Sequence, residues 1–151
     1  MFLKRVIHKP IGKILIEKGI ISHEDLDTAL SLKEEKGGYL GEILIKHGFI
    51  SESQVVFALM SQYEVPYLPV DRYPANFDLF LLFPLFAMEK FSFIPVEKLG
   101  DVVSIATFDP INNEMVDFIH IEAGMLPTIF ICERQKILWR ISQYKEKYGL
   151  A

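Results

Sequence analysis

The chain contains an internal repeat whose two copies are separated by a constant 29 residues. The copies read Ile11-Gly-Lys-Ile-Leu-Ile-Glu-Lys-Gly-Ile-Ile-Ser22 and Leu40-Gly-Glu-Ile-Leu-Ile-Lys-His-Gly-Phe-Ile-Ser51. Nine of the 22 residue pairs that this register aligns from Gly12/Gly41 onward are identical. A repeat of this length corresponds to one supersecondary unit, and a long solenoid needs about three or more such units. The sequence therefore predicts two similar units that pack as a pseudo-twofold pair.

Each copy has the signals of a short helix, a glycine turn and a longer capped helix. Gly19 and Gly48 each follow an apolar run, and glycine readily adopts the left-handed conformation that ends a helix. Ser22 and Ser51 come shortly afterwards, each with a polar side chain three positions further on that can complete a capping box. Apolar residues then recur at the spacing of a buried helical stripe. These are Leu26, Ala29 and Leu30 in the first copy and Val55, Ala58 and Leu59 in the second.

The repeat and the motifs after it match a known family pattern. The second copy reads Leu-Gly-x-x-Leu-Ile-x-x-Gly-Phe-Ile-x-x-x-x-Val-x-x-x-Leu-x-x-Gln from Leu40 to Gln62, and a looser copy runs from Ile11 to Lys33. Three short motifs follow in order, namely Val65-Pro-Tyr-Leu68, Ile94-Pro-Val96 and Ala106-Thr-Phe-Asp-Pro110. In this order and spacing, from about Ile11 to about Tyr148, the chain resembles the amino-terminal domain of type II secretion and type IV pilus assembly ATPases.

The resemblance implies a nucleotide ligand, because some members of that family bind cyclic di-GMP through the two tandem motifs. In those members each motif opens with an arginine and closes with a glutamine. This sequence has Pro10 and Tyr39 at the arginine positions and Lys33 at the first glutamine position. Arginine can stack on guanine and donate two hydrogen bonds to it, which proline cannot do. Weak or absent binding is therefore expected, with a variant mode through Tyr39 and Lys33 as the alternative. The ligand-binding candidates are Ile11, Gly12, Leu40, Gly41, Gln62 and Asp109.

The second half of the chain has the pattern of a small α/β lobe. Two β-rich runs, 91–96 and 102–106, flank a loop whose Gly-Asp pair suits a hairpin, although that loop is longer than two residues. A helix that ends at Gly124, a strand at 127–132 and an amphipathic helix at 133–148 are predicted to follow.

The predicted fold class is α+β, with an amino-terminal helical tandem-repeat lobe and a small α/β lobe that has a short, mostly antiparallel sheet. The expected domains are a helical lobe at 1–67 with repeats 11–33 and 40–62, a joint at 68–76 and an α/β lobe at 77–151.

The most apolar stretch, Phe77 to Met88, is too short for a membrane span, which needs about 20 apolar residues. Pro84 lies inside it, so we expect two short helices that meet at this proline. Six phenylalanines and four leucines lie between Phe77 and Phe93. Core packing is favoured over a docking surface, because exposed patches of that size are uncommon in monomers.

Composition and charge restrict the possible functions. The net charge of −4, with scattered basic residues, argues against nonspecific nucleic-acid binding. The first ten residues are basic but lack the long apolar region of a secretory signal, so a cytoplasmic location is expected. Cys132 is the only cysteine and lies in an apolar run, which predicts a buried structural thiol.

Catalysis has little support in the sequence. No Gly-x-x-x-x-Gly-Lys-Ser/Thr loop is present, so the ATPase motor of the family is absent from this chain. The four histidines lie in different predicted elements, so no metal site is expected. Asp109 precedes a proline after a predicted strand, where a turn role is favoured over a ligand contact.

Two functional hypotheses remain. The favoured one is a non-catalytic docking module that binds an inner-membrane platform or cytoplasmic scaffold protein of a secretion or pilus machine and is recruited to the membrane through it. The alternative is a cyclic di-GMP sensor, in which ligand binding would shift a conformational equilibrium and so change what the domain docks to.

Overall fold

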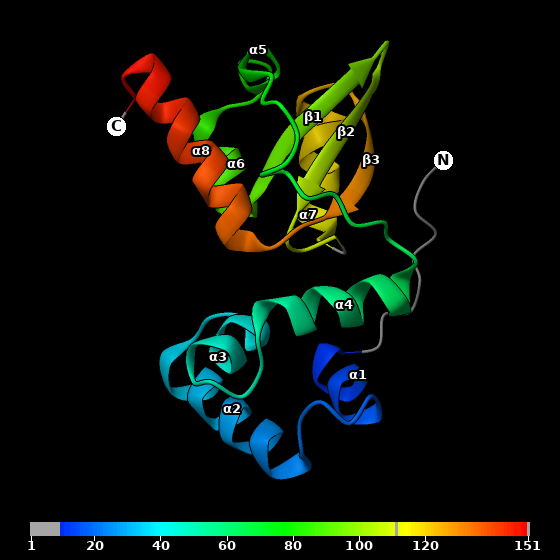
Figure 1. The fold of residues 1–151 in the computed structure, drawn as a ribbon, viewed down its shortest axis with the longest axis vertical. Helices are drawn as coiled ribbons and strands as arrows, with labels where there is room; N and C mark the ends of the chain where they lie inside the picture. Colours follow the sequence, from blue (N-terminus) through cyan, green and yellow to red (C-terminus); the bar gives the residue numbers. More distant parts are fainter. Residues whose placement is uncertain (1–9, 111, 151) are drawn as a thin grey trace. The chain divides into compact units, whose positions relative to one another are not determined.

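The computed structural model describes residues 10–110 and 112–150 (Figure 1). The chain divides into two compact units, Met1–Tyr63 and Glu64–Ala151. The described residues of the first unit form helices, and the second unit combines helices with a three-stranded sheet. The α+β class predicted from the sequence is therefore confirmed.

The helices of the first unit follow the two repeats. They are α1 (Ile11–Glu17), α2 (His23–Lys36), α3 (Leu40–Lys46) and α4 (Glu52–Tyr63). Gly19 and Gly48 separate the helices of each pair with φ angles of 70° and 77°, the left-handed conformation that ends a helix. The amide that follows each glycine donates back into the helix, from Ile20 to the carbonyl of Leu15 and from Phe49 to that of Leu44.

Both longer helices begin with a reciprocal capping box. At α2, the Asp25 amide donates to Ser22 Oγ over 3.1 Å, and the Ser22 amide donates to Asp25 Oδ2 over the same distance. At α4, Ser51 and Gln54 form the same pair of hydrogen bonds, at 3.1 and 2.9 Å. Each box satisfies two amides that would otherwise lack a partner at a helix start, so the repeat fixes where its second helix begins.

Equivalent positions of the two repeats share the core of the first unit. The buried equivalent pairs are Leu15 with Leu44, Ile21 with Ile50 and Ala29 with Ala58. One pair departs from the predicted stripe, because Leu30 is 40% exposed whereas its counterpart Leu59 is buried. The two copies are therefore alike in backbone and in most of the core, and they differ in how fully their second helix is covered within the unit.

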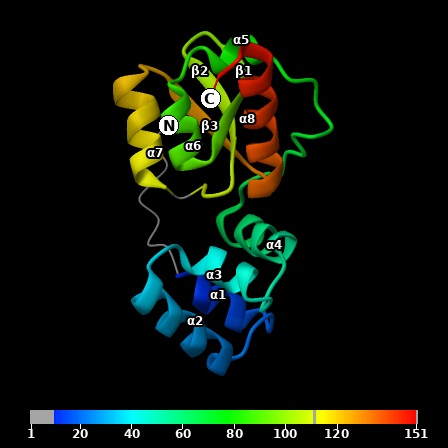
Figure 2. The ribbon, with the colours of Figure 1, turned by 90° about the vertical axis from the view of Figure 1, so that its left-hand side faces the viewer.

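The second unit contains a sheet with helices around it. Its elements are α5 (Phe77–Phe80), α6 (Leu85–Phe91), β1 (Phe93–Leu99), β2 (Val102–Thr107), α7 (Asn113–Asp117), the π-helix η1 (Phe118–Glu122), β3 (Leu126–Ile131) and α8 (Arg134–Tyr148). Helix α8 covers one face of the sheet and α7 lies on the other, while α6 lies by the β1 edge (Figures 1 and 2).

The strand order is β1-β2-β3, and the two pairings have opposite senses. β1 and β2 are antiparallel from Phe93/Thr107 to Leu99/Val102, as the sequence predicted. The strands run further than expected, because Glu97 and Lys98 belong to β1 and the turn is the two-residue Gly100-Asp101. β3 pairs with β2 in parallel, since α7 and η1 carry the chain back to the starting end of β2. The sheet is therefore mixed.

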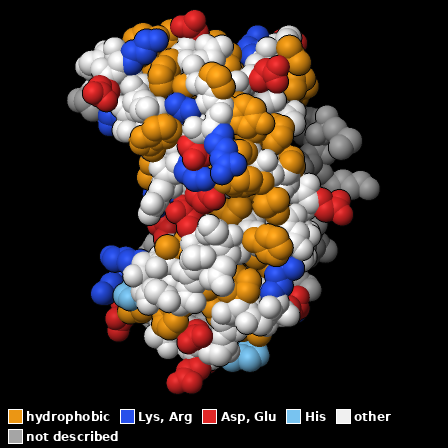
Figure 3. Space-filling view, in the orientation of Figure 1, with side chains coloured by type: hydrophobic (Ala, Val, Ile, Leu, Met, Phe, Trp, Pro, Cys, Tyr) orange, Lys and Arg blue, Asp and Glu red, His pale blue; other side chains and the backbone are white. Residues whose placement is uncertain are grey.

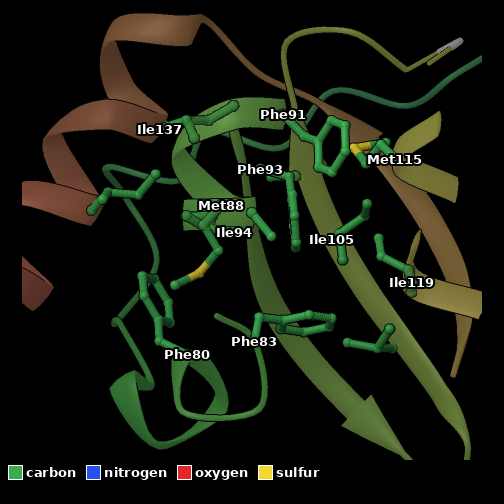
Figure 4. Close-up of a cluster of buried hydrophobic side chains, with 14 of the residues drawn as sticks. Phe80, Phe83, Met88, Phe91, Phe93, Ile94, Ile105, Met115, Ile119 and Ile137 are labelled. Atoms are coloured by element: carbon green, nitrogen blue, oxygen red, sulfur yellow. The ribbon is translucent and has the colours of Figure 1, made fainter. Parts of the chain in front are cut away.

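The phenylalanine-rich segment forms much of the core of the second unit. Pro84 precedes α6 directly, so the two short helices meet at this residue as predicted. Phe80, Phe83 and Phe93 are buried among side chains from the sheet and the helices (Figure 4). Phe86 is the exception within this segment, with 63% of its surface exposed. None of the helices among the described residues is long and apolar enough to cross a membrane.

The chain joins the second unit before the predicted joint at 68–76. The Ile131 amide donates to the Pro66 carbonyl over 2.9 Å, and the Leu68 amide donates to the Ile131 carbonyl over 3.0 Å. Arg140 of α8 then holds the following loop by donating to the carbonyls of Val70 and Tyr73. These hydrogen bonds attach the segment from Pro66 to Tyr73 to the second unit, which begins at Glu64.

Candidate functional site

The two repeat motifs lie at the starts of α1 and α3. The residues that precede these helices, Pro10 and Tyr39, are extended, with ψ angles of 140° and 138°. Neither side chain caps the helix that follows. Ile11 and Leu40, two of the candidate residues, are the first residues of α1 and α3 and are partly buried.

Gly12 and Gly41 lie where the two motifs contact each other. A Cβ atom added at Gly12 would lie 3.3 Å from Leu40 Cδ2, and one added at Gly41 would lie 3.9 Å from Ile11 Cδ1. Each motif thus presents its first apolar side chain to the glycine of the other copy, as a pseudo-twofold pair requires. This arrangement brings four of the six candidate residues together.

The two glycines differ in how closely they are packed. The Cβ position at Gly12 is also 2.6 Å from Cδ1 and 3.2 Å from Cδ2 of Leu26 in α2, distances that a real methyl group could not tolerate without movement. The contact at Gly41 is an ordinary van der Waals distance. Gly12 is therefore the more closely packed of the two, since the ends of leucine side chains would have to move for a methyl group there, whereas Gly41 leaves room for one.

The polar candidates of the first unit lie on its surface. Tyr39 is 65% exposed, which leaves its ring available for stacking, and Lys33 is exposed in the last turn of α2. Gln62 is exposed near the end of α4. The motif positions themselves offer one aromatic ring, one ammonium group and one amide to a nucleotide, without a guanidinium group.

Asp109, the sixth candidate, belongs to the second unit. It is partly buried in the turn between β2 and α7. Its amide donates to Thr107 Oγ1 over 3.2 Å, and its carbonyl accepts from the Asn112 amide over 3.3 Å. These hydrogen bonds are made by the Asp109 backbone, so the role of its carboxylate, as a turn acceptor or as a ligand contact, stays a prediction.

A polar cluster in the second unit was not found from the sequence. Tyr67 Oη donates to both carboxylate oxygens of Glu133, at 2.8 and 2.6 Å, and accepts from Lys136 Nζ over 3.2 Å. Lys136 Nζ also lies 3.4 Å from Asp71 Oδ1 and 3.6 Å from Glu133 Oε2. Because Tyr67 and Glu133 are 66 residues apart, no local pattern signals their meeting.

This cluster changes the proton affinities of its members. Burial alone would raise the pKa of the Glu133 carboxyl, but the hydrogen bond from Tyr67 and further hydrogen bonds together lower it below 4.5. Burial and the bond to Glu133 raise the pKa of Tyr67, and the hydrogen bond with Tyr67 raises the pKa of Lys136. Neighbouring Cys132 is buried, and desolvation raises its thiol pKa to about 12. The cluster thus links the segment after Tyr63 to the start of α8. Cys132, with its raised pKa, is not a reactive thiolate.

Charged groups elsewhere do not converge on a single site. Within 10–110 and 112–150, no group of three or more His, Cys, Asp or Glu side chains could hold a metal ion. Figure 3 shows acidic, basic and hydrophobic side chains interspersed over the face that it presents. Such mixing gives no extended basic surface there for a nucleic acid.

Two curated relatives share the sequence over nearly the whole chain. The type IV pilus assembly ATPase PilB of Myxococcus xanthus is 27% identical over 139 residues, which cover 92% of this chain and 25% of that protein. PilB of Thermus thermophilus is 22% identical over 94% of this chain and 16% of its own length. Bacteriophage adsorption protein B of Escherichia coli is 30% identical over 69% of this chain and 14% of its own length. The chain thus spans a quarter or less of these relatives.

Solved structures share the fold. The structure of MshE with cdg superposes with a TM-score of 0.77 and 25% identity, over 91% of this chain and 99% of that one. The structure of the amino-terminal domain of XpsE gives a TM-score of 0.75 at 19% identity, over 88% of this chain and 92% of that one. This second likeness shows the fold alone.

The family resemblance inferred from the motifs is confirmed by these matches and by a family model. The MshEN domain model matches residues 63–149, which is more than half of the 151 residues. This match covers the mixed sheet and the helices around it, while the tandem motifs lie in the unit before it. The chain belongs to the MshEN domain family.

Proposed function

We propose that this chain is a non-catalytic docking and regulatory domain of a type IV pilus or type II secretion assembly ATPase. Its partner in this proposal is an inner-membrane platform or cytoplasmic scaffold protein of the same machine. The domain would act at the cytoplasmic face of the inner membrane, where that partner would hold it.

The observation that carries the proposal is the extent of the match to PilB. The alignment takes in 92% of this chain but only 25% of the Myxococcus xanthus protein, so the likeness is to one part of an assembly ATPase. The sequence contains no phosphate-binding loop, which leaves positioning or regulation rather than ATP hydrolysis as the role of this chain.

The packing at Gly12 favours docking over nucleotide sensing. The space beside this glycine is taken by leucine side chains of the same unit, so the glycine has a structural role that needs no ligand. Pro10, which stands at one arginine position, supplies neither a charge nor a side-chain hydrogen bond for a nucleotide.

Co-purification tests the docking proposal. An affinity-tagged form of the chain is expressed in a bacterium that assembles the machine, and the detergent-solubilised membrane fraction is captured and identified by mass spectrometry. We expect enrichment of a platform or scaffold component, confirmed by calorimetric titration with its purified cytoplasmic region. If the folded chain enriches no machine component above a tag-only control, the docking proposal is wrong.

The second candidate function is a cyclic di-GMP sensor. It is favoured by the likeness to the structure of MshE with cdg, together with the 65% exposure of Tyr39 next to the start of α3. In this mode the Tyr39 ring stacks on a guanine base, and Lys33 supplies the positive charge for a phosphate. Both side chains lie on the surface of the first unit.

Calorimetric titration with cyclic di-GMP separates the two functions. The sensor predicts micromolar binding that Tyr39→Ala, Gln62→Ala and Gly41→Trp each weaken. Tyr73→Ala is a matched control, because Tyr73 is likewise exposed, at 50%, but lies in the second unit. Absence of heat and of a thermal shift at millimolar ligand would exclude the sensor and leave the docking proposal standing.

A further inference from the structure

An open groove of about 250 Å³ lies between α6 and the continuous α7–η1 segment of the second unit. Figure 2 shows α6, by the β1 edge of the sheet, next to α7. The groove is smaller than the pockets of about 300–1,000 Å³ that enclose small molecules. Its size suits a few side chains of a protein segment better than a whole nucleotide.

The groove has an aromatic floor and two exposed apolar walls. Phe118 contacts Phe86 edge to face, with ring centroids 6.3 Å apart, and its centroid lies 5.9 Å from that of Phe91. Phe91 is buried, whereas Phe86 is 63% and Ile121 is 71% exposed. The apolar floor therefore continues outward into side chains that this unit does not cover, a feature typical of interaction sites.

The rim of the groove is acidic. Glu114, Asp117 and Glu122 lie along it, against the single basic residue Lys90. Lys90 Nζ is already 2.8 Å from Glu114 Oε1 and stacks over Phe91, 5.0 Å from the ring centroid. Asp117 and Glu122 make no ion pair with any residue that the structure describes. The rim therefore retains two carboxylates that can attract a cationic partner.

The π-helical turn places these groups around the groove. The Ala123 amide donates to the Phe118 carbonyl over 3.2 Å. This hydrogen bond joins residues five positions apart, whereas an α-helix joins residues four apart. Such turns are uncommon and occur frequently at functional sites. Here the turn contributes Phe118, Ile121 and Glu122 to the groove within five residues.

We propose that this groove binds an amphipathic segment of a partner protein. Apolar side chains of the segment enter between Phe86 and Ile121, and its Lys or Arg side chains pair with Asp117 and Glu122. This inference rests on the proposed docking function and names the chemistry of its partner. Segments that flank membrane spans on the cytoplasmic side are rich in Lys and Arg, so the partner segment is a juxtamembrane one. The acidic rim disfavours direct binding to anionic lipid itself.

A peptide titration tests the chemistry of the groove. The probe is a fluorescein-labelled 15-residue helical peptide with a leucine stripe and lysines on the other positions, followed by anisotropy. Phe86→Ser and Ile121→Ser are each expected to weaken binding by at least about fivefold. Leu99→Ser is the matched control, because Leu99 is 70% exposed at the hairpin end of the sheet.

Charge reversal tests the rim separately. The double variant Asp117→Lys, Glu122→Lys is expected to weaken the lysine peptide at least about tenfold and to reduce the salt dependence of binding. The same variant is expected to gain affinity for a peptide with glutamate in place of lysine. The proposal is overturned if groove and control variants bind alike, or if the unmodified chain does not bind the lysine peptide at millimolar concentration.

Photo-crosslinking in cells distinguishes failure of the groove from failure of docking as a whole. p-Benzoylphenylalanine replaces Phe86 or Ile121 in the groove, or Phe57 or Leu99 outside it, and the crosslinked peptide is sequenced by mass spectrometry. We expect crosslinks from 86 and 121 to a Lys/Arg-rich juxtamembrane segment of a machine component. Crosslinks to such a component from 57 or 99 alone would overturn the groove but keep docking.

Other crosslinking results would contradict the groove proposal or the docking function. A crosslink from 86 or 121 to the same chain, to a second copy or to an acidic segment would overturn the groove as a partner site. Absence of machine components at all four positions, in a chain that remains folded, would count against the docking function too.

Discussion

Alanine substitution at the two repeat glycines offers the sharpest test of the packing in the first unit. Both glycines lie in helices and have no positive φ angle, so alanine suits the backbone at either position. Alanine is favoured over glycine in a helix by about 0.5–1 kcal/mol. Gly41→Ala is therefore expected to stabilise the unit by about this amount, because its new methyl group meets nothing closer than 3.9 Å.

Gly12→Ala has the same propensity gain but introduces a clash. Its Cβ would lie 2.6 and 3.2 Å from the two methyl groups of Leu26, so the Leu26 side chain would have to move. The same Cβ would also lie 3.3 Å from Cδ2 of Leu40. Overpacking of this kind costs about 1–3 kcal/mol. Gly12→Ala is thus expected to be less stable than Gly41→Ala by about 1–3 kcal/mol.

Hydrogen exchange measured by NMR is the appropriate assay, because it reports the opening free energy of amides in α1 to α4 apart from the second unit. Leu26→Ala makes room beside Gly12, so in that background the difference between the two glycine variants should shrink. If Gly12→Ala is as stable as Gly41→Ala, or if Leu26→Ala leaves the difference unchanged, the packing argument is wrong.

Three further outcomes concern the polar cluster and the thiol of the second unit. Tyr67→Phe should lower the free energy of unfolding by about 1–2 kcal/mol in urea titrations, since it removes hydrogen bonds to a carboxylate that is 15% exposed; an unchanged midpoint would refute this. The lowered pKa of Glu133 contributes stability that is present above pH 4.5 and lost as the pH falls through the folded value. Urea midpoints of the wild type and Glu133→Gln should therefore converge on acidification, and a constant gap would contradict the shift. Cys132, with a pKa of about 12, should react with a disulfide reagent at pH 8 only after unfolding, and rapid labelling of the folded chain would show an accessible thiol.

Local signals in the sequence were sufficient to predict the helices, turns and caps of the first unit. The glycine turns and the serine caps act through hydrogen bonds that span three to five residues, so their partners can be identified along the chain. The exposure of Leu30 could not be found in this way, because its helical spacing is the same as that of buried Leu59. Coverage of a helix depends on which elements pack against it, and periodicity alone does not specify them.

The second unit is harder to predict, because its structure depends more on contacts between residues that are far apart in the sequence. Glu97 and Lys98 look like loop residues in the sequence, yet they belong to β1, because their backbones pair with Ser104 and Val103. The parallel pairing of β3 follows from the crossover through α7 and η1, a property of topology rather than of any strand. The groove likewise joins Phe86 and Ile121 from separate elements.

The unequal packing of Gly12 and Gly41 bears on how the family motif can be interpreted in this chain. The close packing at Gly12 gives this glycine a structural role without a ligand, and Pro10 before it offers a nucleotide no charge. The second copy differs, because Gly41 leaves room for a methyl group and exposed Tyr39 stands before the helix. Any nucleotide affinity should therefore depend on the second copy, and Tyr39→Ala should reduce it more than Pro10→Ala. An equal loss in both variants would mean that the two copies act together despite their different packing.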